Sequence, residues 1–484
     1  MKERNPIKSL VGQTAVYGMG TIIPRLLNYL LVPFYTRIFD LEVYGQITEL
    51  YAYIAFFLVF LTYGMETAFF RFAQKGDSKR VFSNALSSII ITTFGFLLAM
   101  LFLYEPIAQA IHYAGNPEFI IFIAIIVSLD AITAIPFAML RKQNKARLFA
   151  IIKLFNVSFN IGLNILFILV FPQFSKELAN EIFGRDTNLV VWVFISNLLA
   201  SFLSLLMLWP VLKSFRFEIS REILKPMLNY ALPVLVVGLA GMVNEMIDKI
   251  LLKYLIPEVQ NPMAQLGIYG ANYKLGILMT LFIQMFRYAA EPFFFAEAEK
   301  KKAPELFAKV MNYFVISGLL IFLLGTLYID IFKYFIGNKY HEGLGIVPVV
   351  LMANFFYGVY FNLSIWYKLT DRTGDGAKIS VAGAIITLVL NLTLIPIIGY
   401  HGAAWAHFIC YFLMMVASYV WGQKVYPIPY QLKSIFLYIA IAVLFFGISS
   451  FLDIESLTLK LSVNSILFLS FAGFSLAREY RKKY

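Results

Sequence analysis

The sequence has little cysteine and little charge, and each scarcity excludes a class of protein. One cysteine, Cys410, occurs among 484 residues, so an internal disulfide scaffold is excluded. Charged residues make up 14% of the chain, against about 25% in soluble domains, which excludes a soluble globular enzyme and a disordered chain. Hydrophobic residues make up 60%. This composition predicts an all-α integral membrane protein.

Long apolar runs separated by polar turns predict fourteen spans, because a helix needs about 20 apolar residues to cross a bilayer. The first run is too long for a signal peptide, so we expect it to be retained. The spans are expected at 11–36, 45–69, 83–105, 118–140, 148–171, 189–210, 227–252, 267–290, 307–329, 344–366, 376–396, 401–421, 435–452 and 461–477.

Basic residues alternate between the two sets of connections that these spans create. One set, which includes both termini, carries 28 of the 40 lysines and arginines, and the opposite set carries 7. Basic residues accumulate on the cytoplasmic side, so both termini are predicted to be cytoplasmic. The net charge of +12 therefore indicates topology and not a nucleic-acid partner. The longest opposite loop, 172–188, is too short for a catalytic domain.

The chain also contains an internal repeat at an offset of 225 residues. The offset predicts two pseudo-symmetric six-helix lobes of the same orientation, 1–225 and 226–422, facing a central cavity. An additional helix pair with a basic tail, 423–484, lies outside the repeat. The matched residues include Tyr44-Gly45 with Tyr269-Gly270, Glu66 with Glu291, and Phe82 with Phe307.

Charged side chains inside the expected spans are the candidate functional residues. A charge facing lipid at the bilayer centre costs about 2.5–3.5 kcal/mol, so most must face water, form pairs or reach the interface. Arginine and lysine are also natural phosphate ligands, which indicates an anionic cargo. The candidate cargo-binding cations are Arg25, Lys153, Lys274 and Arg287.

Four carboxylates complete the candidate set. Asp130 and Asp248 are candidates for ion coupling, and Glu66 and Glu291 for gating at the inner ends of the lobes. Structural alternatives remain open: Lys153 and Lys274 reach the interface, Arg25 pairs with Asp130, Arg287 pairs with Glu291, and Glu245 pairs with Lys249.

The remaining polar residues give no catalytic signature. Asn160 and Asn164, four apart, would bond either sugar hydroxyls or neighbouring helices. The four histidines lack metal-ligand spacing, and no phosphate-binding loop or nucleophile motif occurs in the sequence. We therefore predict a transporter without a bound cofactor or metal, and not an enzyme.

Five stretches of the sequence carry a family resemblance: Gly12 to Arg37, Leu232-Pro233, Gly238 to Gly241, Asp248-Lys249 and Gly267 to Leu275. They resemble the Wzx-type O-antigen and capsule flippases of the multidrug/oligosaccharidyl-lipid/polysaccharide (MOP) exporter superfamily. The resemblance implies a MATE-like fold with a cationic cavity. It also implies alternating access that moves an undecaprenyl-diphosphate-linked oligosaccharide from the inner to the outer leaflet of the bacterial cytoplasmic (inner) membrane.

The resemblance further implies the partners and the driving force. The expected partners are the lipid-linked glycan, membrane lipids and the polysaccharide polymerase machinery of O-antigen, capsule or exopolysaccharide assembly. An H⁺ or Na⁺ gradient, or the membrane potential, would drive the cycle. The alternatives are a lipid II flippase and a drug/cation antiporter of the same superfamily, although an antiporter cavity should be dominated by carboxylates.

Overall fold

The computed structural model describes residues 20, 22–74, 76–170, 189–300, 302–452 and 454–481, and their secondary structure is helical without a strand. Among these residues, twelve helices are long and apolar enough to cross a membrane, and a bent helix pair makes a thirteenth when the pair is counted as one span. The chain is therefore a multi-pass membrane protein, as the composition predicts. Part of the expected first span (11–19), the loop 172–188 and the end of the basic tail lie outside the described residues.

The chain folds as two compact units. One contains the described residues up to Leu31 together with Gln46–Met242, and the other contains Val32–Gly45 and Val243–Tyr484. The division falls inside helix α12 (Arg221–Leu255), whereas the sequence-based boundary at 225/226 lies near the start of this helix. The 35 residues of α12 are thus shared between the units, and it contains two prolines, Pro226 and Pro233.

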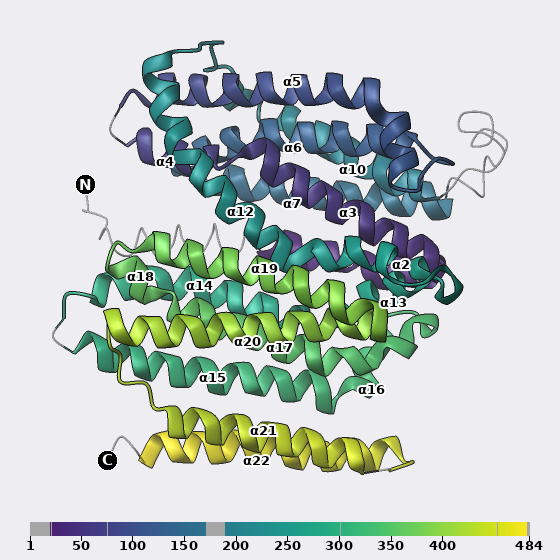
Figure 1. Ribbon diagram of the computed structural model, residues 1–484, viewed down its shortest axis with the longest axis vertical. Coiled ribbons are helices and arrows are strands. Elements are labelled where there is room, and N and C mark those ends of the chain that lie inside the picture. The colour runs from purple at the N-terminus through teal and green to yellow at the C-terminus, as the bar shows by residue number, and fades with distance from the viewer. Residues whose placement is uncertain are drawn as a thin grey trace. The chain divides into compact units, whose positions relative to one another are not determined.

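In the first unit, α5 and α6 lie side by side, and α7 and α10 pack together (Figure 1). Asp77 accepts a hydrogen bond from the backbone N–H of Lys79 and so caps the N-terminus of α5. Gly64, with φ of +72°, separates α3 from α4. The helices are α3 (Leu41–Thr62, mostly in this unit), α4 (Met65–Phe72), α5 (Ser78–Ala110), α6 (Glu118–Lys142), α7 (Ala146–Ile165), a π-helical turn (Leu166–Val170), α10 (Val190–Met207) and α11 (Trp209–Leu212).

The second unit is built around α17 and α20, which pack closely on each other and on α15 and α19 respectively. α13 and α14 form the bent span, with an angle of 49° at Gly276. Gly399, with φ of +57°, makes the turn at the boundary expected near 397–400. The helices are α2 (Leu31–Ile38), α13 (Pro262–Leu275), α14 (Ile277–Glu297), α15 (Ala303–Leu327), α16 (Ile329–Phe332), α17 (Val347–Leu363), α18 (Ile365–Leu369), α19 (Thr373–Ile398), α20 (Tyr400–Val425), α21 (Leu432–Phe451) and α22 (Leu457–Arg481), with short 3₁₀ helices at 258–260, 333–335 and 338–346.

The terminal helices α21 and α22 lie beside α15 in the second unit (Figure 1). Asn464 donates to the carbonyl of Leu327 at 2.6 Å, and Lys460 pairs with Asp330 at 2.7 Å. Burial raises the pKa of the Asp330 carboxyl, but hydrogen bonds from Lys333 and Lys460 outweigh burial and hold that pKa below its usual range. Polar contacts at the end of α15 therefore attach the terminal pair to the second unit.

Two glycines let the backbones of α3 and α13 approach each other within the second unit. A Cβ atom at Gly45 would collide with the carbonyl of Met263, and one at Gly267 would collide with the carbonyl of Leu41. Backbone atoms cannot rotate away as a side chain can, so any larger residue must displace a helix. Gly45 is one of the residues matched in the internal repeat, and the close approach of the two helices requires a glycine at this position.

Replacing Gly267 by alanine should therefore destabilise the second unit. We expect Gly267→Ala to lower the free energy of unfolding by about 1–3 kcal/mol, the usual cost of overpacking. Thermal unfolding of the detergent-solubilised protein measures this change. The control is Gly447→Ala on α21, where a Cβ meets no atom within 4 Å, and helix propensity predicts up to about 1 kcal/mol of stabilisation. Equal Tm values for the two variants would contradict the backbone-contact argument.

Candidate functional site

In the first unit, a cluster of charged side chains surrounds Lys153, and within this cluster Glu66 pairs with Arg141. Glu66 lies in the first turn of α4, and Arg141 lies in the last turn of α6. The guanidinium of Arg141 also lies 5.0 Å from the centre of the Phe70 ring. Both side chains remain partly exposed. Glu66, predicted as a gating carboxylate, thus has a partner within its own unit.

Lys153 and Asp130 form the interior of this cluster. The ammonium of Lys153, on α7, lies 4.0 Å from the centre of the Phe137 ring of α6. Asp130 is among the charges that act on Lys153, together with Glu66, Arg141 and Arg25. Asp130 in turn interacts electrostatically with Lys153 and forms a side-chain hydrogen bond with Ser201. Asp130 therefore lies within electrostatic range of Lys153, and a pairing of Arg25 with Asp130 stays a prediction.

Arg25 differs from the other charges of this cluster because it is exposed. It lies in the helical segment 22–29, directly after the buried Pro24. The positive charges of Arg25 and Lys153 repel each other, as expected for two neighbouring cations. An exposed cation next to a second cation is suited to bind an anion.

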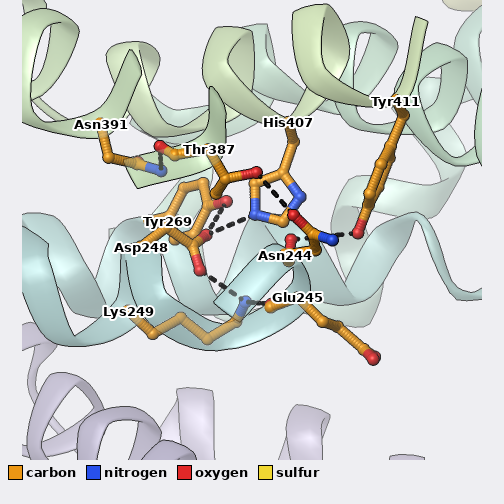
Figure 2. A network of polar contacts seen from close by, with 9 residues as sticks. All are labelled: Asn244, Glu245, Asp248, Lys249, Tyr269, Thr387, Asn391, His407 and Tyr411. Atoms are coloured by element: carbon orange, nitrogen blue, oxygen red, sulfur yellow. Dashed lines mark hydrogen bonds and ion pairs between the residues drawn. The ribbon is translucent and has the colours of Figure 1, made fainter. Parts of the chain in front are cut away.

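The second unit holds a buried network centred on Asp248 (Figure 2). Asp248 on α12 is fully buried, its Oδ1 lies 3.3 Å from the ammonium of Lys249, and its Oδ2 lies 3.0 Å from Nε2 of His407 on α20. Tyr269 on α13 donates its hydroxyl to the same Oδ2. Lys249 donates to the backbone carbonyl of Glu245 at 2.8 Å, so the expected Glu245–Lys249 side-chain pair is replaced by the Asp248–Lys249 pair. Asp248, a predicted coupling carboxylate, is therefore the centre of the network.

Lys274, at the C-terminal end of α13, lies near this network. It is half-buried, and the charge that acts on it is that of Glu245. Glu245 is exposed, and Figure 2 shows its side chain pointing away from Asp248. Lys274 and Glu245 thus belong to the outer edge of the cluster, while Asp248 belongs to its interior.

Arg287 and Glu291 do not pair with each other, although they are four residues apart on α14. Glu291 pairs with Lys368 of α18, and the guanidinium of Arg287 lies 4.1 Å from the centre of the Phe361 ring of α17. These residues line one pocket together with Ser364. Arg287 is exposed, so the pocket presents a cation to its opening. Glu291, like Glu66, takes its partner from a helix two spans later.

Three partner residues were not among the sequence-based candidates: Arg141, Lys368 and His407. Arg141 and Lys368 were assigned to basic cytoplasmic connections, where a positive charge needs no individual explanation. His407 lacks metal-ligand spacing, but its position in an apolar span was a signal, because a polar side chain there requires a partner. Asn164, in contrast, donates to the carbonyl and side chain of Asn160, so these two amides are partly satisfied along α7.

Comparison with known proteins supplies the family. Residues 10–296 match the family of polysaccharide biosynthesis proteins, which is more than half of the chain. The chain belongs to this polysaccharide biosynthesis protein family. The matched region contains all eight predicted site residues, whereas Lys368 and His407 lie beyond it. A relative from the Lsg locus of Haemophilus influenzae is 20% identical over 403 residues, which cover 80% of this chain and 93% of that protein.

Solved structures show that this polysaccharide biosynthesis protein shares the fold of two known membrane transporters. The lipid II flippase MurJ, in an inward closed conformation, has a TM-score of 0.68 at 14% identity, covering 96% of this chain and 99% of that one. An inward-facing MATE multidrug transporter of the MOP superfamily has a TM-score of 0.59 at 13% identity, covering 86% and 97%. The predicted MATE-like architecture is confirmed.

Pairing between Asp130 and Lys153 can be tested by neutralising one or both residues. Each single variant, Asp130→Asn or Lys153→Met, leaves an uncompensated charge and should destabilise the protein by about 1–3 kcal/mol, less than the about 3–5 kcal/mol of a fully buried pair. The double variant should be more stable than either single variant. Thermal unfolding of the three proteins measures the coupling. Additive losses in the double variant would show that the two residues do not compensate each other.

Proposed function

We propose that this protein is a flippase that moves an undecaprenyl-diphosphate-linked oligosaccharide from the inner to the outer leaflet of the bacterial cytoplasmic membrane. The observation that carries the proposal is the match of residues 10–296 to polysaccharide biosynthesis proteins. A membrane protein in that process, with no sizeable extramembrane domain among the described residues, is suited to transporting a lipid-linked intermediate.

The embedded cations support an anionic cargo. Arg25 and Arg287 are exposed, and Arg287 lies at a pocket that Lys368 also lines. Arginine presents a planar set of donors that matches two phosphate oxygens, and lysine adds a compact positive charge. We infer that Arg25, Lys153, Lys274 and Arg287 accompany the diphosphate as the headgroup crosses. The polyprenyl tail remains in the lipid.

The proposed cycle needs no bound cofactor. Alternating access coupled to an H⁺ or Na⁺ gradient, or to the membrane potential, supplies the free energy, and Asp130 and Asp248 are the candidate coupling carboxylates. The released glycan passes to the polymerase machinery of O-antigen, capsule or exopolysaccharide assembly. In this arrangement both termini lie in the cytoplasm, as the distribution of basic residues predicts.

Lipid II is a second candidate cargo, because the solved lipid II flippase matches almost the whole chain. Lipid II also carries a diphosphate, so the same cations would serve it. A drug/cation antiporter is a weaker alternative, because antiport of organic cations favours exposed carboxylates over exposed arginines.

Arg25→Ala should impair export of a surface glycan without preventing membrane insertion. In complementation of a flippase-null strain, we expect export to fall by about tenfold or more, since a charge-assisted phosphate contact contributes about 1.5–3 kcal/mol. Surface polysaccharide and membrane protein abundance are measured together. The matched control is Lys433→Ala at the exposed start of α21, which should export like the wild type.

The same strains separate the candidate cargoes. Glycan export by the wild-type protein supports the proposal, and full export by well-expressed Arg25→Ala removes Arg25 from the mechanism. Rescue of growth after depletion of a lipid II flippase would favour lipid II. Drug resistance without glycan export would favour the antiporter and overturn the proposal.

A further inference from the structure

The Asp248 network of the second unit is the buried charged group for which cargo binding gives no role. Asp248, Lys249 and His407 are almost completely inaccessible, with side-chain exposures of 0%, 7% and 1%. An expensive charged group of this kind inside a membrane span usually marks a functional site. The components of the network show which ion it can exchange.

Protein groups already occupy the acceptor positions of Asp248. Lys249 lies at Oδ1, while the Tyr269 hydroxyl and His407 Nε2 both lie at Oδ2. The ammonium of Lys249 is held by the Glu245 carbonyl and lies 4.3 Å from the centre of the Tyr273 ring. A metal cation at this carboxylate would need several of the same oxygens and would be repelled by Lys249. No group of three or more metal-binding side chains occurs among the described residues.

His407 is the one member of the network that can change charge without losing its carboxylate partner. Its Nε2 lies 3.0 Å from Oδ2 of Asp248, at ion-pair distance, and both ring nitrogens are buried with no hydrogen-bond partner among the described residues. Neutral imidazole has one free lone pair, and addition of a proton makes both nitrogens donors. Protonation would place a second positive charge beside Asp248, and loss of the proton would leave the neutral Asp248–Lys249 pair.

The titratable groups around His407 come from four helices. They are Glu245, Asp248 and Lys249 of α12, Tyr269, Tyr273 and Lys274 of α13, Tyr357 of α17, and Cys410 and Tyr411 of α20. Lys274 lies near Glu245, and Tyr357 stacks on Tyr411. α19 adds two neutral side chains: Thr387 donates to the side-chain oxygen of Asn244, and Asn391 donates to the backbone carbonyl of Thr387 (Figure 2). Within this set, Asp248 is the carboxylate in contact with the ring.

We propose that His407 binds and releases the coupling proton of the transport cycle, and that Lys249 keeps metal cations away from Asp248. This inference rests on the proposed flippase function and specifies its driving ion. The step adds one proton to the free lone pair of the neutral imidazole and returns it to water, with no other bond made or broken. Transport should then depend on pH and be independent of Na⁺.

The proton-binding part can be tested on the purified full-length protein without cargo. Histidine signals labelled with ¹⁵N are followed by NMR through the usual histidine pKa of about 6.5, in NaCl and in KCl. The His407 signal is identified by its loss in His407→Gln. We expect it to titrate identically in the two salts. A His407 signal that does not titrate, or a Tm that NaCl raises and KCl does not, would overturn the proposal.

The coupling part uses the complemented flippase-null strain at external pH of about 6 and 8. Coupling free energies are typically 1–3 kcal/mol, so we expect wild-type export to change about fivefold or more between the two conditions. His407→Gln should insert normally and lose this dependence. The matched control, His401→Gln, changes an exposed histidine of the same helix and should keep it.

The two experiments fail in distinguishable ways. If the wild-type protein exports no glycan while His407 titrates in the purified protein, the proposed cargo is wrong and the proton site stands. If export occurs and His407→Gln keeps the wild-type pH dependence, the proton site is wrong and the flippase function stands.

Discussion

The constraint on which this structure depends is the cost of a charge in a place without water. Each unit meets this cost with short-range partners drawn from its own helices. Asp248 is held by Lys249 and His407, and the buried Glu49 accepts hydrogen bonds from the hydroxyls of Tyr53 and Tyr113. Truncating one partner would leave the other buried without a partner. These paired groups therefore fix the relative positions of the helices that carry them.

The spans were predictable because they follow from length and hydrophobicity alone. Apolar runs identified every described span, and even the indistinct boundary near 397–400 has a local cause in Gly399. The bend between α13 and α14 was not predictable in the same way. Gly276 is one of 29 glycines, and a glycine permits a bend without requiring it.

The members of the candidate site were easier to predict than their partners. A charged residue within an apolar run can be recognised from the sequence alone, as Asp248 and Glu291 were. Spacing of four residues predicted that Arg287 would pair with Glu291, but an intrahelical pair is worth only about 0.2–0.5 kcal/mol. Contacts with Lys368 and Phe361, on helices distant in sequence, prevail over so small a preference. A sequence read one helix at a time does not contain these contacts.

The two kinds of cation in this protein therefore have different physical capacities. Lys249 is buried and already satisfied by Asp248 and the Glu245 carbonyl, so binding an external anion would require breaking contacts that its burial makes expensive. Arg25 and Arg287 are exposed, and water solvates them without such contacts. Replacing that water with phosphate oxygens costs little structural rearrangement. A transporter that must release its cargo needs the second kind of cation for binding, and the first kind is suited to hold a site whose charge changes with a single proton.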